Sequence, residues 1–263
     1  MENKDITEKK ERRKQYWFVI RELTSREIKR KYARSKLGIV WSVLNPLLTM
    51  AVLSLIFSKM FSRSIENYPI YYLCGYILWQ LFTGATNSAM STLVDNKNML
   101  IKVKFPMRIF VMSRVYTAFV NFLYSLIGFA IMICVFRTWP NWTIFFAPVI
   151  VFFLVLFAMG FSYILSTAYV FFGDVKHLYS VLLTLWMYMS AIFYPVDQLG
   201  EFMAKIIRAN PIFNYIDCMR CLILYGTMPS LFEIIRIAVW GIVVYLIGVQ
   251  VFKRNKNKIM QKL

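Results

Sequence analysis

Six stretches of the chain are apolar and free of Asp, Glu, Lys and Arg, and the charged residues gather in the gaps between them. A bilayer core about 30 Å thick is crossed by roughly 20 apolar residues in helical conformation. The pattern therefore predicts an all-α integral membrane protein with six transmembrane helices. The expected spans are Leu37–Ser58, Tyr68–Val94, Val115–Phe136, Thr143–Phe172, Leu178–Val196 and Ile237–Phe252, the last extending back to about Leu231.

The basic residues predict how the chain is oriented in the membrane. Of 31 Lys and Arg, 24 fall in the N-terminal segment 1–36, the alternate gaps 95–114 and 173–177, and the tail 253–263. Basic loops are retained in the cytoplasm. Both termini are therefore expected to be cytoplasmic, which agrees with an even number of spans. We expect three regions: a basic segment 1–36, a six-span domain 37–252 and a basic tail 253–263.

The segment before the first span is expected to contain an interfacial helix. Residues 1–14 are highly charged and are expected to lack order. Residues 16–32 mix Trp17, Phe18 and Ile20 with several Arg and Lys, which is typical of a helix lying in the inner membrane surface. The alternative is a basic anchor that only sets the topology.

Before the last span, residues 197–230 contain two short apolar pieces, 199–209 and 212–225, which Asn210 and Pro211 separate. Neither is long enough to cross the membrane, and lengths of 10–14 residues suit re-entrant or interfacial helices. We therefore expect two short external re-entrant helices. The alternative is an ordinary loop resting on the outer surface. The spacing of Asp217 and Arg220, i and i+3, indicates a local ion pair more simply than a catalytic cluster.

The composition agrees with a membrane protein and argues against several functional classes. The 263 residues are 59% hydrophobic, against about 45–50% in soluble domains. The formal charge of +18 does not indicate nucleic-acid binding, because the cations flank apolar runs. Absence of charge within the spans argues against proton-coupled or sodium-coupled transport and against a charge-selective ion channel.

The chain carries no recognisable motor or catalytic centre of its own. None of its ten glycines is followed by lysine, so the phosphate-binding loop of P-loop ATPases is absent. One histidine, His177, and the pair Cys218 and Cys221 are too few ligands for a structural zinc site. We expect no catalytic residues, no metal and no cofactor bound by this chain.

Aromatic side chains are frequent in the spans. Many of them fit the aromatic belts at the two membrane surfaces. Those nearer the centre of a span could instead line a passage for a neutral polymer, because flat rings stack on sugars without fixing them by charge. The candidates for such a pathway are Phe57, Tyr188, Phe193 and Tyr194.

Several segments, in order, resemble the permease subunit of type-2 ABC transporters that export polysaccharides, the O-antigen and teichoic-acid class. Residues 30–41 read RKYARSKLGIVW, followed by Leu44, Asn45 and Pro46; residues 98–106 read NMLIKVKFP. Residues 172–177 read FGDVKH, residues 191–195 read AIFYP, and Asn210, Pro211 and Arg220 follow. The resemblance covers nearly the whole chain. It departs at Gly173, where the family pattern has arginine before the aspartate.

The resemblance implies a homodimer that carries two copies of a separate cytoplasmic ABC ATPase, which holds ATP and Mg²⁺. It implies a lipid-linked glycan as substrate and the bacterial inner membrane as location. It also implies roles for specific residues. The coupling helix toward the ATPase would be Asn98, Met99, Leu100, Ile101, Lys102, Val103, Lys104 and Phe105; the cytoplasmic mouth Arg34, Lys36, Leu37, Gly38 and Trp41; the external gate Asn210, Pro211, Asp217 and Arg220.

Other interpretations stay open at this point. Residues 98–105 could be only a basic loop that sets the topology. Arg30, Lys31, Arg34 and Lys36 could meet the pyrophosphate of a lipid-linked cargo or lipid headgroups equally well. The same architecture would serve a type-2 ABC permease for drugs or small lipids. A membrane-embedded glycan-processing enzyme is a further alternative, whose external charged cluster would be Asp197, Glu201, Asp217 and Arg220.

Overall fold

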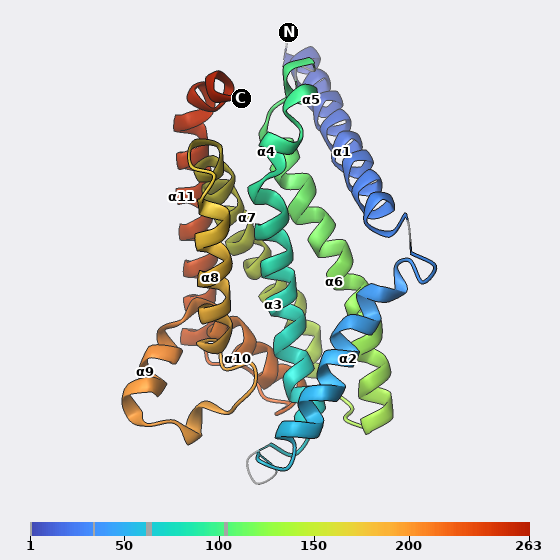
Figure 1. Ribbon diagram of the computed structural model, residues 1–263, viewed down its shortest axis with the longest axis vertical. Helices are drawn as coiled ribbons and strands as arrows, with labels where there is room; N and C mark the ends of the chain where they lie inside the picture. The colour runs from blue at the N-terminus through green and yellow to red at the C-terminus, as the bar shows by residue number, and fades with distance from the viewer. Residues whose placement is uncertain (1, 34, 62–64, 103–104) are drawn as a thin grey trace.

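The computed structural model describes residues 2–33, 35–61, 65–102 and 105–263, and this part of the chain consists of helices and the segments that connect them, with no strand. Its helices lie side by side in an elongated bundle (Figure 1). Both termini lie at one end, together with α4 and α5, and we call it the terminal end; α9 lies at the opposite end, which we call the far end. The elements are α1 (Glu2–Tyr32), α2 (Val40–Phe57), α3 (Tyr68–Met90), α4 (Thr92–Asp95), α5 (Lys97–Lys102), α6 (Arg108–Phe136), η1 (Trp142–Phe146), α7 (Ala147–Phe171), α8 (Val175–Tyr188), η2 (Val196–Gln198), α9 (Glu201–Ala209), α10 (Pro211–Ile223) and α11 (Leu231–Lys262).

Four stretches of the described chain are long and apolar enough to cross a membrane: α2, α6, residues 142–171 of η1 and α7, and α11. The helix α3 is not among them, since it carries Gln80, Asn87 and several hydroxyl side chains within its 23 residues. It lies instead at the centre of the bundle, where most of its side chains are buried against α6, α7 and α10. The membrane character of the chain is thereby confirmed, with four candidate spans.

The helix α8 ends earlier than the sequence predicts. We expected a helical span through Val196, but α8 stops at Tyr188 and is only 14 residues long. The residues that follow are irregular, and Ala191 adopts a positive φ of 45°. The physical reason is that side chains from other helices bind the main-chain carbonyls of this segment, as described below.

The helix α1 also differs from expectation. It begins at Glu2, so the residues expected to lack order are helical. Part of its apolar side packs on α6: Ile20 and Leu23 are buried, and Thr24 donates to the carbonyl of Ser113 at 3.3 Å. Phe18 remains exposed on the other side.

Close helix packing fixes α7 against α11. A side chain added at Gly160 would meet the main chain at Val244, and one added at Gly248 would meet the carbonyl of Gly160. Only glycine permits backbones to approach this closely. The last helix, α11, then continues beyond the apolar part to Lys262, so the basic tail is helical and extends from the bundle at the terminal end (Figure 1).

Of the two short pieces before the last span, α10 is deeply buried. Phe213, Tyr215 and Ile216 are almost fully enclosed, and α10 contacts α3, α7 and α11. The interpretation of this piece as an ordinary surface loop is therefore wrong. In contrast, α9 exposes Phe202 and Met203.

Candidate functional site: a polar cavity beside α3 and α6

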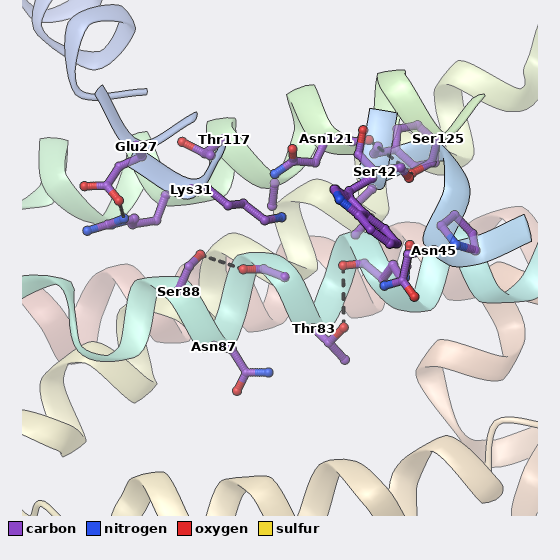
Figure 2. Close-up of a pocket in the computed structure, with 18 of the residues that line it drawn as sticks. Glu27, Lys31, Ser42, Asn45, Thr83, Asn87, Ser88, Thr117, Asn121 and Ser125 are labelled. Atoms are coloured by element: carbon purple, nitrogen blue, oxygen red, sulfur yellow. Dashed lines mark hydrogen bonds and ion pairs between the residues drawn. The ribbon is translucent and has the colours of Figure 1, made fainter. Parts of the chain in front are cut away.

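A cavity of about 650 Å³ lies where α1, α2, α3 and α6 meet, and its lining is unusually polar for an apolar bundle (Figure 2). Its polar lining residues are Glu27, Arg30, Lys31 and Tyr32 of α1, Ser42 and Asn45 of α2, Gln80, Thr83, Asn87 and Ser88 of α3, and Arg114, Thr117, Asn121 and Ser125 of α6. Polar side chains at membrane depth are costly unless they have a partner or face water. Their concentration at one cavity marks it as the candidate functional site.

Helical spacing brings the polar groups of α6 to one side. Arg114, Thr117, Asn121 and Ser125 follow one another at intervals of three and four residues, which places them on the same face of a helix. On α3, Gln80 and Asn87 are seven residues apart and share a face for the same reason. The cavity thus lies between two polar stripes, one on each helix.

The hydroxyl groups of the lining are largely held by their own helices. Thr83 Oγ1 donates to Trp79 O at 2.9 Å, Ser88 Oγ to Gly84 O at 2.5 Å, and Thr117 Oγ1 to Ser113 O at 2.8 Å. Each hydroxyl oxygen keeps lone pairs that can accept hydrogen bonds. The lining can therefore accept hydrogen bonds without carrying charge.

Three lining residues carry a buried polar atom without a hydrogen-bond partner among the described residues: Glu27 Oε1, the hydroxyl of Tyr32 and Asn121 Oδ1. Of these, Glu27 Oε1 lies 3.6 Å from Arg26 Nη2 in an ion pair. Buried polar atoms are usually paired. Because these atoms are themselves buried, they would meet water or a bound molecule only after the wall of the cavity rearranges.

The cavity becomes charged toward the terminal end. Glu27 of α1 forms an ion pair with Arg114 of α6, whose Nε also donates to Thr92 Oγ1 at 3.1 Å. The neighbouring Arg26 donates to Asn96 Oδ1 at 2.9 Å. These contacts join α1, α4 and α6 at one point. Figure 2 shows Lys31 extending from α1 across the cavity.

With Arg30 and Lys31 in the lining and Glu27 paired to Arg114, the charged end of the cavity has an excess of positive charge. It is chemically suited to an anionic group attached to a neutral hydroxylated chain. Among the described residues, no three His, Cys, Asp or Glu side chains group so as to hold a metal ion.

The residues predicted for the cytoplasmic mouth do not all lie at the cavity. Trp41 lies in the first turn of α2 and lines the cavity. Lys36, Leu37 and Gly38 lie in the connection between α1 and α2, where Gly38 has φ +53°, a conformation that favours glycine. Arg34 lies outside the described residues.

The predicted coupling segment begins as α5 at the terminal end. Asn98, Met99, Ile101 and Lys102 are exposed, and Leu100 is buried. Phe105 packs against the buried cluster beneath α5, while Val103 and Lys104 lie outside the described residues. Its role toward an ATPase stays a prediction.

The four pathway aromatics do not line the polar cavity. Phe57 packs 6.1 Å from the ring of Tyr68. Phe193 lies 5.7 Å from Tyr72 and 5.9 Å from Tyr188. Tyr194 donates its hydroxyl to Tyr188 O at 2.5 Å. The structure thus brings Tyr188, Phe193 and Tyr194 together in and beside the irregular segment after α8, whereas Phe57 meets that segment through Tyr68.

Two of the four residues expected to form an external gate, Asn210 and Arg220, bind that segment. Asn210 Nδ2 donates to Met189 O at 2.9 Å, while its Oδ1 accepts hydrogen bonds from Trp186 Nε1 at 2.8 Å and from the amide of Ile212 at 3.0 Å. The last of these bonds caps α10, whose first residue is Pro211.

Arg220 is 1% exposed. Its guanidinium donates to Ala191 O at 3.0 Å and to Ile192 O at 3.1 Å, and lies 3.5 Å from the ring centroid of Tyr71. Within the described chain it makes no ion pair with Asp217, so the interpretation of these two residues as a local ion pair is wrong. Burial raises the pKa of the Asp217 carboxyl, and the nearby Arg220 partly opposes that effect.

Sequence reasoning missed most of the cavity because it searched the spans for full charges. The informative signal was present in the four amides Asn45, Gln80, Asn87 and Asn121, which stand inside otherwise apolar stretches. Together with the helical spacing on α6, they indicate where a polar face turns inward.

Comparison with known proteins places this bundle in a family. The model of the family described as "ABC-2 type transporter" matches residues 19–224. An O-antigen export system permease protein RfbA of Myxococcus xanthus is 27% identical, covering 95% of this chain and 96% of that protein. Another, from Klebsiella pneumoniae, is 29% identical over 92% of this chain and 93% of its own length. A capsule polysaccharide export inner-membrane protein, CtrC of Neisseria meningitidis serogroup A, is 24% identical over 77% of each chain. With the match extending from α1 through α10, the chain belongs to the ABC-2 type transporter family.

Proposed function

We propose that the chain is the membrane subunit of an ATP-driven exporter that moves a lipid-linked polysaccharide across the bacterial inner membrane. The names of three similar proteins specify export of O-antigen or capsule polysaccharide. The single observation that carries the proposal is the polar cavity of about 650 Å³, because its neutral hydrogen-bonding lining suits the hydroxyl groups of a sugar chain.

The direction of the chain supports six crossings. It alternates between the two ends through α2, α3, α6, α7, α8 and α11 (Figure 1). The segments that hold 24 of the 31 basic residues then lie at the terminal end, which we assign to the cytoplasm. In this arrangement α3 crosses within protein, α8 and its irregular continuation complete the fifth crossing, and α9 and α10 return into the outer leaflet.

Exposed polar groups support a homodimer. Asn45 of α2 and Asn87 of α3 are exposed in this single chain, although they sit within apolar helices. In contact with lipid each amide would be unsatisfied. A second copy facing α2 and α3 would enclose these amides around a shared passage, with the cavity as one half of it.

The charged end of the cavity would receive the cargo first. Arg30 and Lys31 lie where an inner-leaflet pyrophosphate would enter, and the ion pair of Glu27 with Arg114 keeps that carboxylate from repelling it. The sugars would follow along the amides, and the aromatic residues near the far end would complete the pathway.

Energy would come from two copies of an ATPase subunit bound at the terminal end. The exposed apolar side chains Met99 and Ile101 of α5, with Lys102 beside them, form a small surface suited to a groove on such a partner. Because α4 and α5 lie between α3 and α6 in the chain, a push on α5 would reach both walls of the cavity.

The test replaces two of the cavity amides with leucine, an apolar side chain of similar size. Gln80→Leu and Asn121→Leu, together, should lower the rate of glycan export about tenfold or more, since each lost hydrogen bond is worth about 1 kcal/mol. Surface glycan is measured in cells in which this chain is the sole permease. Asn255→Leu, an amide change on the basic extension of α11, is the matched control.

Assembly must be measured alongside export. Co-purification of the ATPase subunit with the double variant would show that only the passage has changed. Normal glycan export by a properly assembled Gln80→Leu, Asn121→Leu variant would contradict the cavity as the pathway. Normal glycan export in cells that lack this chain, combined with lost efflux of drugs or small lipids, would favour a small-molecule permease instead.

A further inference from the structure

A second hollow lies on the other side of α6. It is a groove of about 670 Å³ between α6 and α7, whose floor is formed by α3 and α10. Its lining is almost wholly hydrocarbon and aromatic, in contrast to the polar cavity. Representative residues are Val115, Phe119 and Leu126 of α6 and Val151, Val155 and Met159 of α7.

The groove runs along the helices for most of the membrane thickness. On α6 its lining extends from Met112 to Phe129, which at 1.5 Å per residue corresponds to about 25 Å. On α7 it extends from Ala147 to Met159. A hydrocarbon core is about 30 Å thick, so the groove has nearly the depth of the bilayer.

A smaller cavity of about 330 Å³ adjoins the groove at the terminal end and shares Ile20 and Met112 with it. Its lining includes Arg108, the first residue of α6, and Lys253 of α11, with the phenol side chains of Tyr163 and Tyr245. Both cations are exposed. Among the described residues, no carboxylate forms an ion pair with Arg108 or Lys253.

The groove and the polar cavity are separate sites. Their linings share only Ile77 and Phe122. Asn121 of α6 faces the cavity, whereas Phe119 and Leu123 of the same helix face the groove. A molecule in the groove would therefore contact none of the amides that we assign to the sugar chain.

We propose that the groove and its basic mouth form a binding site for a resident anionic phospholipid of the inner leaflet, with an acyl chain between α6 and α7 and the phosphate beside Arg108 and Lys253. The proposal relies on the orientation given above and not on the cargo. Charge complementarity favours this occupant, because basic pockets between helices on the cytoplasmic side bind anionic headgroups. The acyl chain fills an apolar space that would otherwise leave its lining without contacts.

Bound lipid would also support α1. Trp17 and Ile20 of α1 form part of the groove wall, and Trp17 packs edge-on against Tyr116 at 5.1 Å. An acyl chain beneath these residues extends the apolar surface on which α1 rests. The lipid is thus a structural component of the bundle.

The experiment measures lipid retained by the purified permease–ATPase complex after detergent exchange, without ATP or glycan. Native mass spectrometry counts phosphatidylglycerol and phosphatidylcholine supplied in equal amounts. We expect phosphatidylglycerol to be preferred about tenfold, since each of two cations contributes near the membrane surface. Arg108→Gln with Lys253→Gln should abolish the preference. Arg254→Gln with Lys256→Gln removes the same charge outside the groove and should preserve it.

A second measurement locates the acyl chain of the bound lipid. Phosphatidylglycerol with a photoreactive acyl chain should label peptides of α6 and α7, and Val155→Trp, which fills the groove, should reduce that labelling. The proposal is overturned by equal retention of the two lipids, by an Arg108→Gln, Lys253→Gln variant that behaves like the control, or by displacement of phosphatidylglycerol by equimolar undecaprenyl phosphate. The last result would assign the groove to the cargo lipid. A failure of the export proposal leaves these readouts unchanged.

Discussion

Asn210 and Arg220 bind carbonyls two residues apart in one irregular segment: Asn210 Nδ2 donates to Met189 O at 2.9 Å, and Arg220 donates to Ala191 O at 3.0 Å. Two tyrosines complete the arrangement, since Tyr68 donates to Phe193 O and Tyr71 to Tyr194 O, each at 3.0 Å. Most main-chain carbonyls of the segment that follows α8 therefore accept a hydrogen bond from a side chain of another helix. A non-helical backbone can lie inside a membrane protein only when its polar groups are bound in this way.

Replacing Arg220 with glutamine should destabilise the protein by about 2–4 kcal/mol, because buried carbonyls lose their donors at about 1–3 kcal/mol each. Thermal unfolding of the detergent-purified protein measures the loss. Arg208→Gln is the matched control, since Arg208 only meets the exposed Asp197 at 3.5 Å, and surface pairs contribute about 0–1 kcal/mol. Equal melting temperatures for the two variants would contradict a structural role for Arg220.

The contact between α7 and α11 should tolerate no side chain at its centre. Gly248→Val would drive a side chain into the carbonyl of Gly160, and we expect the yield of folded protein to fall severely, at a cost of more than about 3 kcal/mol. Gly173→Ala provides the comparison, since open space surrounds Gly173. Size-exclusion profiles of the solubilised variants report the outcome, and a normal Gly248→Val profile would refute the packing argument.

The ion pair between Glu27 and Arg114 should hold α1 on the bundle. Arg114→Met leaves the carboxylate of Glu27 with only its longer contact to Arg26 at 3.6 Å, and loss of one partner of a buried pair typically costs up to about 3–5 kcal/mol. We expect trypsin to cleave α1 faster in that variant. Adding Glu27→Gln should restore part of the protection, whereas Arg21→Gln, on the exposed side of α1, should have no effect. Additive effects of the two changes would show that the residues act independently.

Asp217 should make stability depend on pH. Its folded-state pKa is raised, mainly by burial, so the folded protein binds the proton more tightly than the unfolded chain. The destabilisation is absent below the unfolded pKa of about 3.9 and complete above the folded pKa, and stability falls as pH rises between the two. Asp217→Asn should flatten that part of the curve and raise the melting temperature at pH 7. A curve parallel to wild type would exclude Asp217 as its source.

Charge and shape at α5 should control binding of the ATPase. Ile101→Glu with Lys102→Glu should weaken co-purification of the partner by about tenfold or more, because an apolar contact is replaced by charge and a cation is reversed. Lys97→Glu, at the start of α5, tests whether charge alone has this effect. An intact, active complex with the double variant would place the interface elsewhere.

The sequence predicted the features that depend on local pattern. Apolar runs identified the long helices, and Asn210 and Pro211 marked the start of α10. It could not predict the end of α8, because Arg220 and Asn210 reach that segment from 20 or more residues away. It could not predict that α10 is enclosed, since amphipathic spacing does not distinguish protein from lipid as the neighbour. The cavity was within reach, because unpaired amides in apolar helices indicate an inward polar face.

The helix α6 separates the polar cavity from the apolar groove, so a movement of this helix changes both. One face carries Asn121 and the opposite face carries Phe119, so a rotation of this helix that widened the proposed passage would narrow the groove on its other side. If lipid fills that groove, as proposed above, the composition of the surrounding bilayer would affect the free energy of such a rotation.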